Sequence, residues 1–265
     1  MPDQPDSLPS LSRNGDVFLL DLGDGENRFN PDRNGIIEEL VSGLESAPAP
    51  RAMVTVARGK IWSNGLDLEW FQANPDRVQE ALDQTERLIG RILGLGVPTV
   101  AAIQGHCFAG GAMLALAHDF ILMREDRGYF CLPEADLGLP FTPGMNSLLL
   151  SRLPRRTAHE VMVTGRRFGG AEAAAAGIVD QTVTENELLP AAIERAAGQA
   201  PKNPETLKAI KCRIYEETID LLETSHPLGT WQGAPGRAPG DIRSSAWQRS
   251  PRAIEMAAES TRRSM

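Results

Sequence analysis

Short apolar runs alternate with amphipathic stretches along most of the chain. Four runs favour β-strands because they are short and rich in apolar or β-branched residues: 17–22, 53–57, 99–103 and 120–123. Run 53–57 is almost continuously apolar, as expected for a strand that is covered on both faces. The alternation of strands with helices predicts an α/β fold, a sheet with crossover helices.

The helices are predicted from apolar residues that recur every three or four positions. The first helix follows Asp32, its expected N-cap, and carries apolar residues at Ile36, Ile37, Leu40, Val41 and Leu44. The second helix starts at Asn74-Pro75 and continues to Gly94. A third helix begins near Ala109.

The same pattern divides the chain into four parts. Residues 1–13 are rich in Pro, Ser and Asp, so we expect a flexible arm. Residues 14–154 hold the alternating strands and helices, and residues 155–224 follow a helical pattern. Residues 225–265 form a Gly- and Pro-rich tail whose role stays unassigned.

Composition and charge exclude several classes of function. The chain has 265 residues, of which 42% are hydrophobic, and this is enough for a sizeable core. Its 27 basic and 35 acidic residues give a net charge of −8, so we expect no nucleic acid and no membrane among its partners. No run reaches the roughly 18 apolar residues of a membrane-spanning helix.

The cysteines and the chain ends predict a cytoplasmic location. Cys107, Cys131 and Cys212 are odd in number and lack the spacing of metal ligands, so we expect reduced thiols and no bound metal. The first residues do not have the apolar core of a secretory leader, and the last four, Arg-Arg-Ser-Met, differ from the peroxisomal address S-K-L.

A turn crowded with small residues joins strand 99–103 to the next helix. Gly105 allows a bend, and Ala109, Gly110 and Gly111 open the helix. The first amides of a helix have no intrahelical acceptor, so this turn favours a bound negative oxygen. For two adjacent glycines alone, tight helix packing is the competing explanation.

A second loop of this kind follows strand 53–57 and reads Trp62-Ser63-Asn64-Gly65-Leu66-Asp67-Leu68. Two such loops after two strands can supply one N–H group each. The pair resembles the oxyanion hole of the crotonase superfamily, the enoyl-CoA hydratase/isomerase family, whose loops read F-x-x-G-x-D-[LI] and G-x-x-x-G-G. The likeness extends over about residues 15–222.

This resemblance implies a fold, a substrate and an assembly. The fold is a crotonase-like spiral of strand-strand-helix turns, followed by a helical C-terminal trimerisation region, so a homotrimer or hexamer is expected. The substrate is an acyl-CoA thioester. Coenzyme A enters as part of that substrate, and no separate cofactor is expected.

The resemblance also assigns roles to residues of the two loops. The thioester oxygen accepts hydrogen bonds from the N–H groups of Leu66 and Gly110. The neighbouring residues that are expected to contact the substrate are Ser63, Asn64, Gly65, Asp67, Leu68, Gly111 and Met113.

Two carboxylates follow the second loop within an apolar run. A carboxylate beside apolar walls has a raised pKa, which suits it for exchanging protons near neutral pH. Glu134 and Gly138 match the segment [PN]-E-x-x-x-G that holds a catalytic Glu in the family. The resemblance therefore implies that Glu134 is the acid/base. Asp136, two residues further on, is an alternative member of the site, although a turn or structural acid is the favoured interpretation.

Departures from the family pattern bear on the reaction. Hydratases carry a second Glu at the position of Met113, dienoyl-CoA isomerases an Asp at the position of Thr142, and peroxisomal-type isomerases a Glu near 142–144. None of these acids is present, which favours a Δ3,Δ2-enoyl-CoA isomerase with a single Glu. An enoyl-CoA hydratase, and a non-catalytic homologue that binds acyl-CoA or a protein, remain alternatives. A hydrolase based on His106 and Asp119 is disfavoured because the chain has no G-x-S-x-G elbow.

Overall fold

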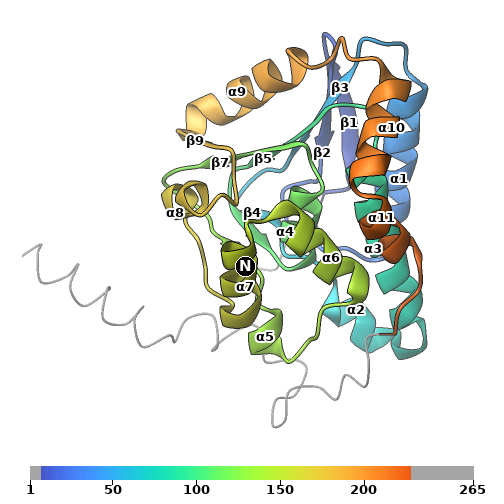
Figure 1. Ribbon diagram of the computed structural model, residues 1–265, viewed down its shortest axis with the longest axis vertical. Coiled ribbons are helices and arrows are strands. Elements are labelled where there is room, and N and C mark those ends of the chain that lie inside the picture. Colours follow the sequence, from blue (N-terminus) through green and yellow to red (C-terminus); the bar gives the residue numbers. More distant parts are fainter. Residues whose placement is uncertain (1–6, 228–265) are drawn as a thin grey trace, which may run out of the picture.

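Two β-sheets organise the structure, a computed structural model that describes residues 7–227 (Figure 1). The larger sheet has the strand order β1-β2-β3-β5-β7-β9, and its strands are Ser10–Asn14, Val17–Asp21, Ala52–Val56, Thr99–Ile103, Phe120–Arg124 and Gln181–Val183. The smaller sheet has the order β4-β6-β8, with strands Ile61–Ser63, His106–Phe108 and Phe130–Cys131. Strands β1 and β2 pair antiparallel, and the other neighbours within each sheet pair parallel.

The chain repeats one unit: a strand in the larger sheet, a strand in the smaller sheet, and then a helical segment. The first such unit is β3, β4 and the helices α2 (Leu68–Ala73), η1 (Pro75–Arg77) and α3 (Val78–Leu93). The next two units are β5-β6-α4 (Gly110–Leu116) and β7-β8-α5 (Glu134–Leu137). This repetition confirms the expected spiral of strand-strand-helix turns.

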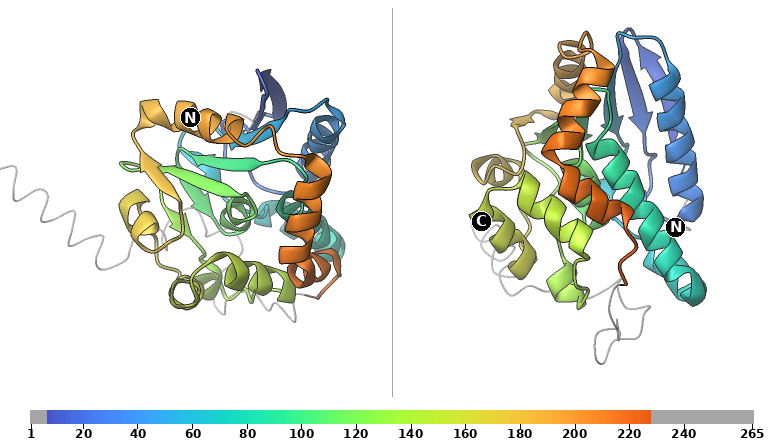
Figure 2. Two further views of the ribbon diagram at one scale, coloured as in Figure 1. Left: turned by 45° about the horizontal axis from the view of Figure 1, so that its top comes forward. Right: turned by 45° about the vertical axis from the view of Figure 1, so that its right-hand side comes forward.

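The two faces of the larger sheet bury separate sets of side chains. On one face, helix α9 (Glu185–Ala197) packs over residues such as Val54 and Val100. On the other face, Met53 and Ala101 join the main core together with α1 (Pro31–Ser46), α3 and α4 (Figure 2). Successive side chains of a strand point to opposite faces, so the apolar strands supply both cores.

The C-terminal helices pack against the side of the spiral. They are α6 (Pro143–Arg152), α7 (Arg155–Thr164), α8 (Gly170–Ala175), α10 (Pro204–Ile214) and α11 (Glu216–Glu223). Helix α11 packs against both α3 and α6 (Figure 1). Its buried Leu222 reaches Gly90 of α3 and Gly144 of α6, where an added Cβ would lie 3.3 Å and 3.0 Å from Leu222 atoms. Across residues 7–227 the helices are all too short or too polar to span a membrane.

Several elements differ from the expectations. The expected arm 1–13 contains strand β1, because polar residues 10–14 fold back on β2 through a two-residue turn with Gly15 at φ +61°. The N-cap of α1 is Asn30 and not Asp32; its side chain accepts a hydrogen bond from the Arg33 amide at 3.0 Å.

The region 155–224 is not purely helical, because β9 joins the larger sheet beside β7. A three-residue strand is too short to show a period of two, and its pairing partner lies far away in sequence. Most of the tail 225–265 lies outside the described residues, which end at 227.

We predict that Leu222→Ala lowers the free energy of unfolding by about 2–5 kcal/mol, because it leaves a cavity between α3 and α6. Urea unfolding followed by circular dichroism measures this change. Leu189→Ala on α9 is the control, since Leu189 is 41% exposed and its truncation is expected to cost less than about 0.5 kcal/mol. Equal losses in the two variants would contradict the role given to Leu222.

Candidate active site

The smaller sheet brings three segments to one edge. Its strands β4, β6 and β8 are parallel, so their carboxyl ends lie on the same side. Strand β4 leads to Leu66, β6 leads to Gly110, and β8 leads to Glu134. The amide of Ala109 donates to the carbonyl of Cys131 at 3.0 Å and ties the second segment to the third. Ligands of α/β folds bind outside the carboxyl ends of parallel strands, so this edge is the candidate site.

The N–H group of Leu66 points away from Phe29, the residue with which Leu66 forms a β-bridge. The amide of Phe29 donates to the carbonyl of Gly65 at 2.7 Å, and the amide of Asp67 donates to the carbonyl of Phe29 at 2.9 Å. These two bonds form a parallel bridge between Phe29 and Leu66. Backbone groups alternate along an extended strand, so the Leu66 amide faces the opposite side, where Gly110 lies.

The N–H group of Gly110 is the first amide of α4. Helix geometry leaves such an amide without an intrahelical acceptor. The preceding residue, Ala109, has φ 51° and ψ −125°, a conformation that residues other than glycine rarely adopt. Strained backbone of this kind persists where the surrounding structure enforces it, and it is common at functional sites.

The two amide loops touch each other. A Cβ added at Gly65 would lie only 2.6 Å from the nitrogen of Gly110, and Gly65 has φ +79°. A Cβ added at Gly110 would lie 3.7 Å from the nitrogen of Leu66. The amides of Leu66 and Gly110 are therefore close neighbours across the contact of the two loops. A single oxygen between two such N–H donors matches the geometry of an oxyanion hole.

Several residues that are expected to contact the substrate make hydrogen bonds that hold the first loop in shape. The Ser63 hydroxyl is buried, donates to the carbonyl of Asn27 at 2.8 Å and accepts from the amide of Gly65 at 3.1 Å. Asn64 donates to Glu26 at 2.9 Å, and Asp67 caps α2 by accepting from the amide of Trp70 at 3.0 Å.

Three further residues that are expected to contact the substrate are Gly111, Met113 and Leu68. Gly111 packs on Ser63, because an added Cβ would lie 2.7 Å from Ser63 atoms. Met113 is 1% exposed and belongs to the main hydrophobic core. Leu68 is the first residue of α2 and is half-buried. The structure thus brings Leu66 and Gly110 together, and it places Ser63, Gly111 and Met113 behind them.

Glu134 is the buried acid at this edge. Its side chain is 6% exposed, and Oε2 is buried without a hydrogen-bond partner among the described residues. Burial disfavours the charged carboxylate and raises the pKa of Glu134 to about 7, although a backbone N–H group opposes the shift. Asp136, by contrast, is exposed. Of the two acids, only Glu134 has the surroundings of a neutral-range acid/base.

A second buried acid, Glu86 on α3, did not enter the expectations. It is 0% exposed, and burial raises its pKa to about 7. The Thr142 hydroxyl donates to its Oε1. The sequence does contain a signal for this residue, because Glu86 lies four positions after Leu82 and three before Ile89, within the apolar stripe of α3.

His106 and Asp119 do not meet. Asp119 accepts from Lys211 Nζ at 2.6 Å and from the amide of Thr99 at 2.8 Å. The ring of His106 stacks on Tyr129 with a centroid distance of 5.6 Å. Because the two side chains belong to separate networks, His106 and Asp119 do not form the pair that a hydrolase would use.

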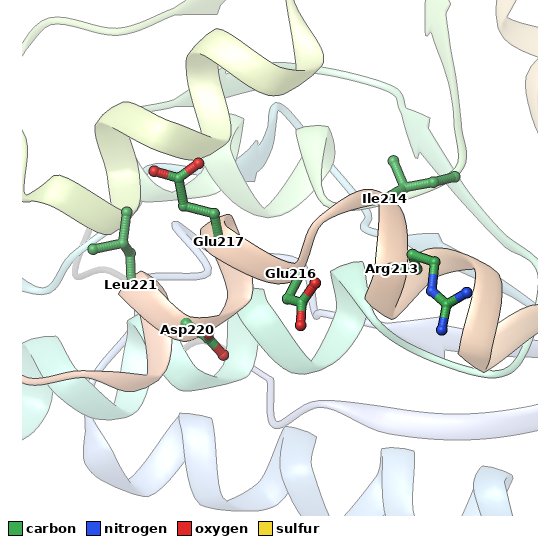
Figure 3. A pocket seen from close by; sticks show the side chains of 6 residues that line it. All are labelled: Arg213, Ile214, Glu216, Glu217, Asp220 and Leu221. Atoms are coloured by element: carbon green, nitrogen blue, oxygen red, sulfur yellow. The ribbon is translucent and has the colours of Figure 1, made fainter.

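A shallow hollow of ≈ 530 Å³ lies against α10 and α11 (Figure 3). It is lined by Arg213, Ile214, Glu216, Glu217, Asp220 and Leu221. None of these residues belongs to the three segments of the candidate site. Three acids against one base also make this hollow a poor place for the phosphates of coenzyme A.

The chain is similar to known enzymes over most of its length. A family profile described as "Enoyl-CoA hydratase/isomerase" matches residues 24–226. The chain is 33% identical over 226 residues to enoyl-CoA delta isomerase 2, peroxisomal, of Arabidopsis thaliana, and this match covers 80% of the chain and 94% of the relative. It is also 33% identical over 215 residues to carnitinyl-CoA dehydratase of Escherichia coli K12, with 80% and 81% covered.

Solved structures share the fold. A crystal structure of an enoyl-CoA hydratase/isomerase family protein from Pseudomonas syringae aligns with a TM-score of 0.77 at 24% identity. The match covers 82% of this chain and 94% of the other. The spiral arrangement of the two sheets is therefore shared with solved members of that family.

We predict that Gly110→Pro lowers turnover of a thioester substrate about 10²- to 10³-fold, because proline removes one of two donors to the thioester oxygen. Proline is tolerated at the first position of a helix. The measurement is kcat after circular dichroism has verified folding. Gly43→Ala is the control, because a Cβ there meets nothing within 4 Å. Unchanged turnover in a folded Gly110→Pro variant would remove Gly110 from the oxyanion hole.

Proposed function

The chain belongs to the enoyl-CoA hydratase/isomerase family, and within that family we propose that it is a Δ3,Δ2-enoyl-CoA isomerase. The observation that carries the proposal is Glu134, a buried carboxyl on the segment that follows β8, the strand paired with β6, which leads to Gly110 and its close neighbour Leu66. In this proposal Glu134 is the single acid/base. The relative from Arabidopsis thaliana, whose name is that of an enoyl-CoA delta isomerase, supports it.

The proposed reaction needs only these groups. The thioester oxygen of a bound 3-enoyl-CoA accepts hydrogen bonds from the N–H groups of Leu66 and Gly110. Glu134, as carboxylate, removes a proton from C2, and the C–H electron pair enters a dienolate whose negative charge lies mainly on the thioester oxygen. The protonated Glu134 then returns the proton to C4, and the double bond moves to C2–C3. The carboxylate is regenerated, so no water and no second acid is consumed.

The electrostatics of the site support this cycle. A pKa of about 7 for Glu134 means that the carboxyl both accepts and releases a proton with little cost at neutral pH. Two fixed backbone N–H groups stabilise the oxyanion without having to reorient, and each such donor typically contributes a factor of about 10²–10³ in rate.

Hydration of a 2-enoyl-CoA is the second candidate. The similarity to carnitinyl-CoA dehydratase favours it. Against it stands Met113, a buried thioether at the position where hydratases carry their second Glu. A thioether is a weak acceptor and cannot take a proton from water at neutral pH, so a water molecule would have one carboxylate fewer to activate it. Binding of acyl-CoA without turnover is the non-enzymatic alternative.

We also propose that the chain assembles into homotrimers or pairs of trimers. The support is a set of large apolar side chains exposed on the C-terminal helices: Leu150, Val163, Ile210 and Ile214. Figure 3 shows Ile214 at the end of α10, beside the hollow. Burying such side chains against another copy stabilises an assembly.

The cellular location stays a proposal. The composition favours the cytoplasm, whereas the name of the relative from Arabidopsis thaliana includes "peroxisomal". Coenzyme A is needed only as part of the substrate in this scheme, since the proton transfer uses groups of the chain.

We predict that wild type isomerises 3-enoyl-CoA faster than it hydrates 2-enoyl-CoA, and that Glu134→Gln loses turnover at least about 10²-fold. Glutamine keeps the shape of the side chain but cannot accept the proton, so binding is retained. Separate assays follow the conjugated product and the 3-hydroxy product. Asp136→Asn is the matched control, because Asp136 is exposed two residues away. Efficient hydration without isomerisation would show that a second acid acts.

We predict that kcat/KM for isomerisation rises about tenfold per pH unit below pH 7 and becomes level above it. The reason is that the carboxylate of Glu134 is the base and its pKa is about 7. A pH–rate profile from pH 5 to pH 9 measures this. A profile that is level from pH 5 upward would assign the base to a group with an ordinary carboxyl pKa.

We predict a sedimentation coefficient of a trimer or hexamer at micromolar concentration. Ile214→Glu together with Ile210→Glu should weaken the assembly, because both side chains are more than half exposed in the single chain and would be charged at the interface. A wild type that sediments only as a single chain would contradict the assembly.

A further inference from the structure

Glu86 is a fully buried acid that the proposed reaction does not use. It lies in the interior of α3 and is 0% exposed. Glutamate is almost never fully buried unless it is paired. Among the described residues, no ion pair of Glu86 is present, so the position requires another explanation.

Only one of its two carboxyl oxygens is satisfied. Oε1 accepts a hydrogen bond from the hydroxyl of Thr142. That hydroxyl is itself occupied, because it accepts from the amide of Met145 at 3.1 Å as the N-cap of α6. Oε2 is buried and has no hydrogen-bond partner within residues 7–227. Leaving a buried polar group unsatisfied typically costs about 1–3 kcal/mol, so a hydrogen-bonding ligand at Oε2 would be stabilised.

The pair of Glu86 and Thr142 belongs to the same structural units as the candidate active site. Thr142 ends the segment that begins at Glu134, and this segment folds back through a hydrogen bond from the Leu139 amide to the Glu134 carbonyl at 3.0 Å. Helix α3 packs on α4, which begins at Gly110, and α4 packs on α6, which begins after Thr142. The hydrogen bond from the Thr142 hydroxyl therefore joins Glu86 of α3 to the segment that begins at Glu134, and α3 also packs on the helix that begins at Gly110.

The chemistry of the carboxyl selects the kind of group that fits. The net pKa of Glu86 is raised to about 7: burial is the main cause and the nearby Asp83 adds to it, while Thr142 and the Met145 amide oppose the shift. Near neutral pH the carboxyl is therefore present in both forms. The protonated form donates a hydrogen bond and the carboxylate accepts one. A hydroxyl group can accept and donate, so it suits both forms, whereas a carbonyl oxygen suits only one.

We propose that Glu86, held by Thr142, is a specificity-determining residue that binds a hydroxyl group on the acyl chain of the substrate through its free oxygen Oε2. This inference rests on the proposed function, because it concerns the acyl group of the same thioester. A water molecule offers the same hydroxyl chemistry to Oε2. The two sources differ in one respect: only an acyl hydroxyl changes the ranking of substrates.

The test uses 3-enoyl-CoA substrates of one chain length, either unsubstituted or with a single hydroxyl at successive carbons beyond C4. The measurement is kcat/KM for isomerisation by the full-length protein. For one position of the hydroxyl, wild type should gain at least about tenfold over the unsubstituted chain, since sites built to bind a substrate hydroxyl reject the analogue that lacks it. Glu86→Leu should remove this gain, and Glu86→Gln, which still donates and accepts, should retain part of it.

Glu80→Leu is the matched control on the same helix, because Glu80 is exposed and its replacement should leave the ranking unchanged. The proposal is overturned if wild type favours no hydroxylated isomer, which would leave only water at Oε2. It is also overturned if a folded Glu86→Leu variant keeps the preference. If the Glu86→Leu variant does not fold, wild type and Glu86→Gln still test the proposal. A wild type that shows no preference for a hydroxylated substrate is sufficient to reject the proposal.

Failure of this inference can be distinguished from failure of the proposed function. If the unsubstituted and hydroxylated substrates are isomerised equally well, the proposed isomerase activity is supported and the proposed role of Glu86 is rejected. If none of the 3-enoyl substrates is isomerised, the isomerase itself is rejected.

Discussion

The close approach of two backbone loops is the constraint on which the candidate site depends. The Gly65 loop and the start of α4 are so near that a Cβ at Gly65 would collide with the Gly110 nitrogen. Ser63 and Gly111 are packed against each other with the same tightness one step behind. The amides of Leu66 and Gly110 are thereby fixed before any ligand arrives. Donors that are already oriented stabilise a developing charge without a reorganisation cost, and this is what the packing would contribute to the proposed reaction.

The parallel pairing of the smaller sheet extends this constraint to the acid. Because β6 pairs with β8, the bond from the Ala109 amide to the Cys131 carbonyl links the segment of Gly110 to the segment of Glu134. The groups of the proposed reaction are thus brought together by backbone pairing of the sheet. Each participating group lies a few residues after a strand end, and the sheet aligns those ends. The side chains of Ser63 and Asp67 then shape the loops through their hydrogen bonds to the backbone.

The sequence predicts the parts of the fold that have a strong local pattern. Strand β5 lies over residues 99–103, as predicted. A short run of apolar and β-branched residues between turn residues strongly favours a strand. Strand β9 has no such pattern and exists through its pairing with β7. The second sheet follows from the family resemblance and not from periodicity, since β8 has two residues. Glu86 was overlooked because charged residues on helices are usually solvated, and only its place within the apolar stripe of α3 sets it apart.

Two buried acids link the chemistry of this protein to its stability. In Glu134 and Glu86 the pKa is raised by burial from an ordinary value of 4.5 to about 7. The folded state therefore binds more protons than the unfolded state between these values, and linkage requires that stability decreases as pH rises through that window. Below pH 4.5 both states are protonated and the contribution is complete; above pH 7 it is lost. In the proposed reaction Glu134 exchanges a proton near neutral pH, and the raised pKa that this role requires is the same property that lowers stability between pH 4.5 and pH 7. Functional sites commonly carry such a cost, and for these two acids it arises from their shared burial.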